Sequence, residues 1–418
     1  MMSMRKALCI FVGIVCLAMF VPLATGQGAP AAVLVQGKLT EPDATPFHLQ
    51  AVVTENVDPN VHVDVEMFWV APDKWRRTIK SDEFSQTLIV NGEKTFEQDS
   101  DDYFPLGIRV LATALVDPTD VVNALRPGDL VRTKANGKAD ESGKRCAPSG
   151  GACIVDSPYG LLEWVGAAGH QVDFTDYQVF KGKRMARQLR YLIEIGDFLQ
   201  AKVTTLEELK NEDESLFAVP EPTPREKQNR TVILTEPELR ALAAQPMDII
   251  WPQILDDPRT TGDARYYVSV DRSGNVREVF PRRVSFKEAD DSVRRQIMKW
   301  KFKTPVKDGM PVQVEALMDL TYETRAYGPS SLLTDEQARK LASNIVEPIF
   351  PPGTKSGSTC AVRIAVDQDG NVIQRHGGDC APGLFESCSN AMDKWHFSPI
   401  LDNGKQLPYR AEILFRAP

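Results

Sequence analysis

The chain has 418 residues, of which 42% are hydrophobic and 25% charged, and its formal net charge is −8. This composition is typical of a globular chain long enough for roughly two to four domains. It excludes a collagen, a small disulfide-stapled knot and a wholly disordered chain. The acidic balance also argues against a nucleic-acid partner, which usually meets a basic surface.

The N-terminus, residues 1–26, has the pattern of a targeting segment. Two basic residues precede an uncharged run from Ala7 to Ala24, and small residues lead to Gln27. This order is typical of a secretory signal, so we expect cleavage before Gln27. The alternative is a retained anchor, although the run is at the lower length limit for a membrane span and contains a glycine and a proline.

Residues 27–215 predict a large antiparallel sheet bent around one apolar face. Alternating apolar residues predict strands at 33–39, 61–70, 75–79, 87–90, 95–98, 170–180, 184–195 and 198–206. Residues 99–118 predict a helical or irregular crossover. The acidic cluster at 99–102 is more simply interpreted as a solvated loop than as a catalytic carboxylate pair.

A charged, proline-rich stretch at 216–232 predicts a linker with little to bury. Beyond it, residues 233–328 and 329–418 repeat each other at a spacing of about 95 to 99 residues, far longer than a solenoid unit. Each repeat opens with a helix capping box, carries a hairpin with a Gly-Asn turn, and continues into a helix and a last strand. The shared motif residues are Trp251, Pro252, Gly274, Trp300 and Phe302 in the first repeat, and Phe350, Pro351, Gly370, Trp395 and Phe397 in the second. The two helix-ending tryptophans are predicted core anchors rather than ligand-stacking residues.

These motifs, in this order, resemble the TonB C-terminal domain family over about 235–328 and again over 333–418. The resemblance implies a small sheet packed on helices in the periplasm, which pairs with an extended segment of an outer-membrane receptor or another envelope protein. The last strand of each repeat is then the candidate peptide-binding edge. Its residues are Val312, Val314, Ala316 and Met318 in the first repeat, and Tyr409, Ala411, Ile413 and Phe415 in the second.

The N-terminal region resembles the outer-membrane lipoprotein carrier (LolA-like) family. The segments that carry this resemblance are 68–75, the hairpin at 89–96, and 172–177. It implies a half-barrel whose concave apolar face could hold a lipid or acyl chain. The expected fold is therefore α+β: an N-terminal curved antiparallel half-barrel sheet with helices, followed by two small tandem TonB-C-like α+β domains.

The cysteines indicate an oxidising compartment. Cys146 and Cys153 bracket a Gly/Pro turn that could close a small disulfide loop. Cys380 could pair with Cys360 across the second hairpin or with Cys388 on the following helix, and the sequence leaves both pairings open.

No catalytic, metal-binding or cofactor-binding pattern is found in the sequence. The segment 367–371 is better explained as a hairpin turn than as a calcium loop. We therefore expect a non-enzymatic cell-envelope protein without metal or cofactor, acting as a TonB-like energy transducer or adaptor that docks receptor segments. The alternative is a soluble periplasmic lipid or lipoprotein carrier. The expected location is the periplasm or cell envelope of a Gram-negative-type bacterium, with anchoring in the inner membrane if the run from Ala7 to Ala24 is retained.

Overall fold

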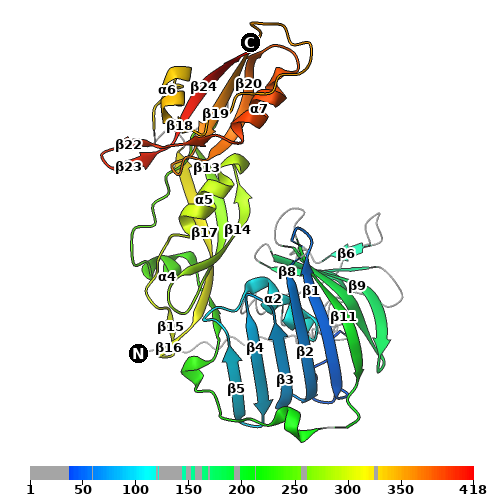
Figure 1. Cartoon of the computed structure of the whole chain (residues 1–418). Helices are drawn as coiled ribbons and strands as arrows, with labels where there is room; N and C mark the ends of the chain where they lie inside the picture. Colours follow the sequence, from blue (N-terminus) through cyan, green and yellow to red (C-terminus); the bar gives the residue numbers. More distant parts are fainter. Residues whose placement is uncertain are drawn as a thin grey trace, which may run out of the picture.

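The computed structural model describes residues 37–58, 60–118, 121, 144–146, 152–155, 162–167, 170–192, 198–211, 213–255, 261–323 and 328–418 (Figure 1). Over these ranges the chain is mainly β-sheet with few helices. No helix within them has both the length and the apolarity that a membrane crossing needs. The expected signal segment, 1–26, lies outside the described residues.

The N-terminal half forms one open antiparallel sheet of 11 strands, in the order β5-β4-β3-β2-β1-β11-β10-β9-β8-β7-β6. The first and last strands, β1 and β11, pair along their length and so join two meanders into one sheet. Figure 1 shows its curvature, with helix α2 (Leu106–Ala114) against one face. The strands are β1 (Phe47–Glu55), β2 (His62–Ala71), β3 (Lys74–Lys80), β4 (Ser85–Asn91), β5 (Lys94–Asp99), β6 (Lys144–Cys146), β7 (Ala152–Val155), β8 (Leu162–Ala167), β9 (His170–Phe180), β10 (Lys183–Leu192) and β11 (Phe198–Glu208).

The first strand differs from the prediction. The described part of 33–39 is turn and irregular chain, and the strand is Phe47–Glu55 instead. Its apolar residues, such as Phe47 and Leu49, face the core, while His48 and Gln50 face outward. Pairing with β2 on one side and β11 on the other fixes this segment as a strand, and neither pairing is visible in a local pattern.

The proline-rich segment predicted as a loose linker is bound along the edge of the sheet. The Thr223 amide donates to Thr95 O at 2.8 Å, and the Thr223 hydroxyl accepts from the Glu97 amide at 2.7 Å. Phe217, in the short 3-10 helix η1 (Glu214–Phe217), is 0% exposed. The segment therefore covers β5, whose free edge would otherwise offer unpaired backbone groups.

The first C-terminal unit, residues 231–323, is a four-stranded sheet in the order β12-β17-β13-β14. Helix α5 packs on the face opposite the N-terminal half, around a core that contains Val293 and Trp300. Its elements are β12 (Thr231–Ile233), α4 (Glu236–Ala241), β13 (Thr261–Val270), β14 (Val276–Val284), η3 (Lys287–Ala289), α5 (Asp290–Ile297), β15 (Val306–Lys307), β16 (Met310–Pro311) and β17 (Gln313–Glu323); the 3-10 helix η2 (Arg225–Lys227) precedes them.

The second unit, residues 328–418, has a three-stranded sheet in the order β20-β19-β24. Trp395 and Phe397 lie in its core, as Trp300 and Phe302 do in the first unit, so the tryptophans are core anchors as predicted. Its elements are α6 (Asp335–Leu341), β18 (Ala342–Ser343), β19 (Thr359–Val366), β20 (Val372–Cys380), α7 (Leu384–Met392), β21 (His396–Phe397), β22 (Ile400–Asp402), β23 (Lys405–Leu407) and β24 (Tyr409–Arg416).

The predicted hairpins and capping boxes are confirmed in both units. Each hairpin turn is held by a buried aspartate. Asp271 Oδ1 accepts from the amides of Ser273 and Asn275 at 2.9 and 2.8 Å, and Asp367 Oδ1 makes the matching contacts in the second unit. Both carboxylates thus serve their own turns, which agrees with the hairpin interpretation of 367–371.

Candidate functional site

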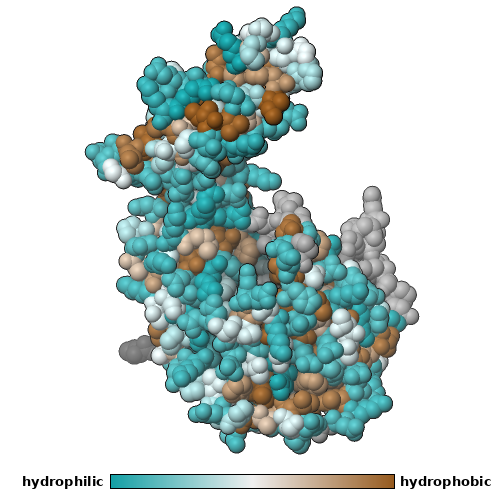
Figure 2. Space-filling model, viewed as in Figure 1, coloured by the Kyte–Doolittle hydropathy of each residue, from teal (hydrophilic) through white to brown (hydrophobic). Residues whose placement is uncertain are grey.

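The apolar face of the N-terminal sheet is covered by α2. Seven of the nine residues of α2 are buried. They share one core with inward-facing strand residues, among them Phe47, Leu49, Trp69, Val172, Leu189 and Ala201. The opposite face of the sheet carries polar side chains such as Gln50 and Glu66, and the side turned to the viewer in Figure 2 is mostly hydrophilic. The sheet therefore has one buried, apolar face and one polar face.

Gly107 lets α2 approach the sheet closely. A Cβ at this position would lie 2.5 Å from Leu199 Cδ1 and 3.3 Å from Tyr191 Cδ1. The helix backbone therefore packs directly on the side chains of Leu199 and Tyr191 at this point.

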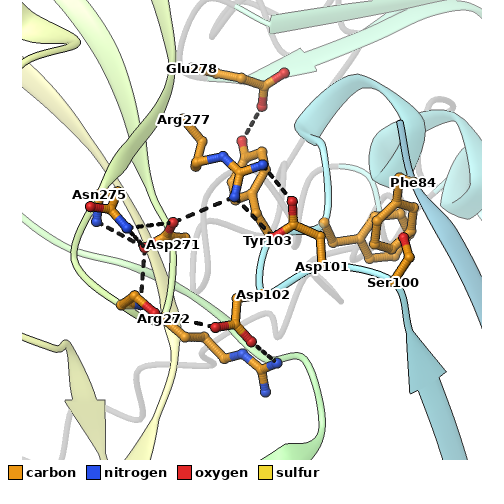
Figure 3. A network of polar contacts seen from close by, with 12 residues as sticks. Phe84, Ser100, Asp101, Asp102, Tyr103, Asp271, Arg272, Asn275, Arg277 and Glu278 are labelled. Atoms are coloured by element: carbon orange, nitrogen blue, oxygen red, sulfur yellow. Dashed lines mark hydrogen bonds and ion pairs between the residues drawn. The ribbon is translucent and has the colours of Figure 1, made fainter. Parts of the chain in front are cut away.

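The first unit supplies the hydrogen-bond acceptor at the start of α2. The N-cap residue, Pro105, has no side-chain capping bond. Instead, Glu278 Oε2 on β14 accepts from the Leu106 amide at 3.0 Å, and it also accepts from the Tyr103 hydroxyl. Figure 3 shows Glu278 pointing toward Tyr103 between the two parts of the chain. A carboxylate at a helix N-terminus satisfies a free amide and interacts favourably with the helix dipole.

Two side chains of β17 extend this contact. The side-chain amide of Gln313 accepts from the backbone N–H of Phe104 at 2.9 Å and donates to the Phe104 carbonyl at 3.1 Å. One turn into α2, Arg109 forms an ion pair with Glu315, whose side chain is 0% exposed, and the Tyr267 hydroxyl donates to the same carboxylate at 2.7 Å. The first unit therefore contacts α2 through buried polar side chains on both β14 and β17.

The acidic cluster before α2 is part of this interface. Asp101 pairs with Arg277 at 2.6 Å and Asp102 with Arg272 at 2.8 Å (Figure 3). The segment is a loop, as interpreted, and the Asp102 side chain is 54% exposed. Each carboxylate nevertheless meets an arginine from a segment about 170 positions away. The arginine pairs also oppose a carboxylate-dyad role.

Burial shifts the proton affinities in this interface. Burial, with the nearby charge of Glu315, raises the pKa of Glu278, although hydrogen bonds from Tyr103 and Leu106 oppose the shift. Burial lowers the pKa of Arg109, but the negative charge of Glu315 outweighs the effect of burial, so the pKa of Arg109 is raised above its ordinary value. The interface is thus a low-dielectric environment in which each polar partner is worth more than it would be in water.

His170 closes the other side of this interface. It is 2% exposed, packs edge-on against Tyr267 with ring centroids 4.3 Å apart, and shares a 2.5 Å hydrogen bond with the Tyr191 hydroxyl. Arg282 contacts its Nδ1 at 2.8 Å. Burial and the charges of Arg282 and Arg109 hold the pKa of His170 well below its usual value. The imidazole is therefore neutral, and a metal role gains no support from its neighbours.

The predicted edge strands are partly occupied by other segments of the same chain. Strand β17 is an inner strand, because β12 pairs with Gln313–Glu315 in parallel. Beyond that pairing, Glu236 accepts from the Asp319 amide at 3.1 Å and Arg240 donates to the Asp319 carbonyl at 3.2 Å. The chain itself thus occupies the edge that a receptor segment was expected to pair with.

In the second unit, β24 is an edge strand of its sheet, and other segments of the chain again contact its outer backbone groups. Leu333 exchanges backbone hydrogen bonds with Arg410 and Glu412 of β24 at 2.8 and 3.0 Å. Asp335 accepts from the Leu414 amide and Arg339 donates to the Leu414 carbonyl, both at 3.1 Å. The side chains proposed for the two edges are core residues, each at most 1% exposed: Val312, Val314, Ala316, Met318, Tyr409, Ala411, Ile413 and Phe415. A receptor segment would have to displace these contacts to pair with either strand, and strand addition here stays a prediction.

The late cysteines form a disulfide between Cys360 and Cys380, and Cys388 is free and buried. The structure thus decides between the two pairings that the sequence left open. Burial raises the pKa of the Cys388 thiol to about 11, which makes it unreactive. The backbone positions of Cys146 and Cys153 are direct partners in the β6–β7 ladder, but their side chains lie outside what the structure describes.

Removing this disulfide should destabilise the second unit. We expect Cys360→Ala/Cys380→Ala to lower its free energy of unfolding by about 3 kcal/mol, because the unfolded chain regains the conformational entropy that the cross-link removes. Thermal unfolding with and without reductant measures the effect, and reductant should affect the wild type but not the double variant. Cys388→Ala, at a buried cysteine outside the bond, is the control, with an expected loss of about 1 kcal/mol. A wild-type melting temperature that ignores reductant would contradict the prediction.

Glu97 on β5 should make stability pH-dependent. Burial and the neighbouring charge of Asp99 raise its pKa to about 7 from an ordinary 4.5. The folded state therefore holds the proton more tightly, and stability falls as the pH rises from about 4.5 to 7. We expect Glu97→Gln to stabilise the protein by about 1–2 kcal/mol at pH 8 and to have no effect at pH 4. The gain at pH 8 is limited because Glu97 is partly exposed and water screens its charge. Urea unfolding at both pH values tests this, with the exposed Glu93→Gln as control; equal effects at both would refute it.

Within the part of the chain that the structure describes, no group of three or more His, Cys, Asp or Glu side chains is placed to hold a metal ion. Sequence reasoning missed the polar residues of the interface: Arg109, Glu278, Gln313 and Glu315. In the sequence, Gln313 and Glu315 alternate with apolar residues, which is the usual pattern of a strand with one solvent-facing side. No local signal distinguishes that pattern from burial under a second layer.

No protein-family model matches the chain, and no curated protein matches it. Among solved structures, a LolA superfamily protein from Nitrosomonas europaea is 9% identical, with 45% of this chain and 97% of that chain covered at a TM-score of 0.28. A DUF1329 family protein from Desulfovibrio piger is also 9% identical, with 46% and 98% covered at a TM-score of 0.28. Both likenesses are remote, and the resemblance of the two C-terminal units to TonB C-terminal domains stays a prediction.

Proposed function

We propose that the N-terminal sheet binds the acyl chain of a lipid or lipoprotein, and that the arrangement described above is its closed form. The observation that carries the proposal is that a helix of nine residues covers part of the apolar sheet face. Side chains of α2 such as Val110 and Leu111 join that core, as do Val121 and, from the first unit, Tyr267. A second sheet could not be lifted without unfolding the domain, whereas a nine-residue helix is a small enough unit to move.

Exchange of α2 for an acyl chain is energetically reasonable. Burying a methylene group stabilises a complex by about 0.8 kcal/mol. An acyl chain along the apolar face would replace the contacts of residues such as Leu111 and Val110, each 0% exposed. Because one apolar contact replaces another, loading and release can both remain accessible.

The N-terminus and the disulfide of the second unit bear on where the proposed carrier acts. We propose a non-enzymatic protein of the cell envelope, in which no bond of the cargo is broken. The signal-type N-terminus and the Cys360–Cys380 disulfide support an oxidising compartment. Cell fractionation with N-terminal sequencing tests this: a mature start near Gln27 in the soluble periplasmic fraction is expected, and an intact N-terminus in the cytoplasm would contradict it.

A brominated fatty acid tests the cargo site, because bromine quenches tryptophan fluorescence on contact. Trp69 is 0% exposed on the apolar face, where it stacks on Phe47 with ring centroids 5.6 Å apart. We expect saturable quenching of the full chain by dibromostearate and none by the same concentration of a brominated short-chain acid. The quenching should be reduced in Trp69→Phe, with the remainder from Trp75, which packs against the same core.

Trp300→Phe is the matched control, because Trp300 is equally buried, at 3% exposed, but lies in the core of the first unit. It should leave the quenching unchanged. Absence of saturable quenching, or quenching that is undiminished in Trp69→Phe, would refute acyl-chain binding on this face.

A further inference from the structure

The two ends of α2 are attached to different parts of the protein. Beyond its C-terminal end, the Leu39 amide donates to the Val116 carbonyl at 2.8 Å and Lys38 pairs with Asp117 at 2.5 Å, all within the N-terminal half. At the N-terminal end, the polar partners described above for residues 103–109 come from the first C-terminal unit: Glu278, Gln313 and Glu315. A helix attached in this way can hinge away from the sheet at its start only if the first unit releases it.

The first unit also compensates for what the local sequence of α2 lacks. With proline at the N-cap and no acidic residue in its first turn, α2 has no capping side chain of its own. Loss of an N-cap typically destabilises a helix enough to matter for a segment this short. The Glu278 carboxylate on β14 fills this role from 172 positions away.

The first unit offers these groups on a rigid support. Glu278 lies on β14 and Glu315 on β17, the two strands that flank β13. Both residues are directly opposite Ser269 of β13. The face that carries them also packs Tyr267, Phe280 and Leu317 against the core of the N-terminal half. Movement of this sheet by a small amount would therefore affect all three grips on α2 together.

We infer that the first C-terminal unit is a latch for α2, with Glu278, Gln313 and Glu315 as positioning residues that keep the apolar face closed. The inference deepens the proposed function, since it names what controls access to the acyl-chain site. Separation of the first unit from residues 103–109 would free α2 and open that face. A partner that binds the first unit can thus set the loading of the sheet without touching the cargo.

Hydrogen exchange of the α2 amides, measured on the full chain without ligand, tests the latch directly. We expect Glu278→Ala to speed exchange over 106–114 by about tenfold or more, with β1 and β24 unchanged. Glu278→Gln keeps an acceptor oxygen but removes the charge, so it should give a smaller increase. Glu288→Ala, which removes an exposed carboxylate of the same unit, is the control. If β13 and β14 also lose protection in Glu278→Ala, Gln313→Ala is the second test, because it breaks the Phe104 hydrogen bonds and a 3.2 Å hydrogen bond to Glu315 while Glu278 stays in place.

Uptake of dibromostearate, followed by Trp69 quenching, separates this inference from the proposed function. Faster α2 exchange together with faster uptake supports both. Faster exchange without any binding in wild type or variant would leave the latch standing and refute the carrier. Unchanged α2 exchange in both Glu278→Ala and Gln313→Ala would overturn the latch, whatever the binding data show. Exchange that rises equally in β1 and α2 would also overturn it, since the contact would then only stabilise the whole fold.

Discussion

Replacing Glu315 with alanine is expected to lower the free energy of unfolding by about 3–5 kcal/mol, because it leaves a buried charge without its partner. The Arg109 side chain is 12% exposed and that of Glu315 is 0% exposed. The substitution also removes the acceptor of the Tyr267 hydroxyl. Urea unfolding followed by circular dichroism measures the change, and the shift should be largest in the transition of the N-terminal half.

A surface pair of the same chemistry supplies the control. Arg363 and Glu412 are 39% and 42% exposed, so Glu412→Ala should cost less than about 1 kcal/mol. Replacing both partners of the buried pair by apolar residues, as in Arg109→Met/Glu315→Leu, should recover much of the loss. If Glu315→Ala costs no more than Glu412→Ala, the interface between the first unit and α2 is not buried in solution.

Alanine at Gly274 is expected to cost about 2–5 kcal/mol in the first unit. Gly274 has φ +88°, where a non-glycine residue is strained by about 1–2 kcal/mol. Its Cβ would also lie 2.1 Å from the Phe302 carbonyl oxygen, so the backbone would have to shift, which adds a further 1–3 kcal/mol or so. Thermal unfolding of the variant should show the transition of the first unit at a lower temperature.

Gly309 separates the two contributions. It has φ +77°, and no atom lies within 4 Å of a Cβ built there. Gly309→Ala should therefore cost only the backbone strain, about 1–2 kcal/mol. Gly370→Ala, at the matching turn of the second unit, should behave like Gly274→Ala, because its Cβ would lie 2.0 Å from the Phe397 carbonyl oxygen. Equal costs at Gly274 and Gly309 would show that the close approach to Phe302 plays no part.

These two predictions concern different kinds of information. The turn glycines were visible in the sequence as half of a Gly-Asn signal, because a tight hairpin needs a positive φ at that position. Glu315 was not visible, because a glutamate that alternates with valine and alanine is the ordinary pattern of a half-exposed strand. It becomes a buried ion-pair partner only when α2 packs against the face of the first unit's sheet that carries Glu315.

The same distinction applies to the predicted binding edges. The sequence shows a strand at the end of each repeat and an acidic, capped helix at its start. It does not show that the residues preceding and opening the helix fold back onto that strand. In both units an acidic side chain at the helix start and an arginine further along satisfy the outer backbone groups of the last strand. The candidate binding residues then face the core, and the docking surface expected from the resemblance is occupied.

By itself, the sequence determined the tandem repeat, the two hairpins, the capping boxes and the tryptophan anchors. These features depend on residues a few positions apart, so backbone geometry and side-chain spacing suffice to specify them. Only the tertiary structure decided the pairing of β1 with β11, the Cys360–Cys380 bond between two open alternatives, and the capping of α2 by Glu278. Those contacts join segments far apart in the chain or select one of several local pairings. Their free energy comes from burial that arises only when the layers are assembled.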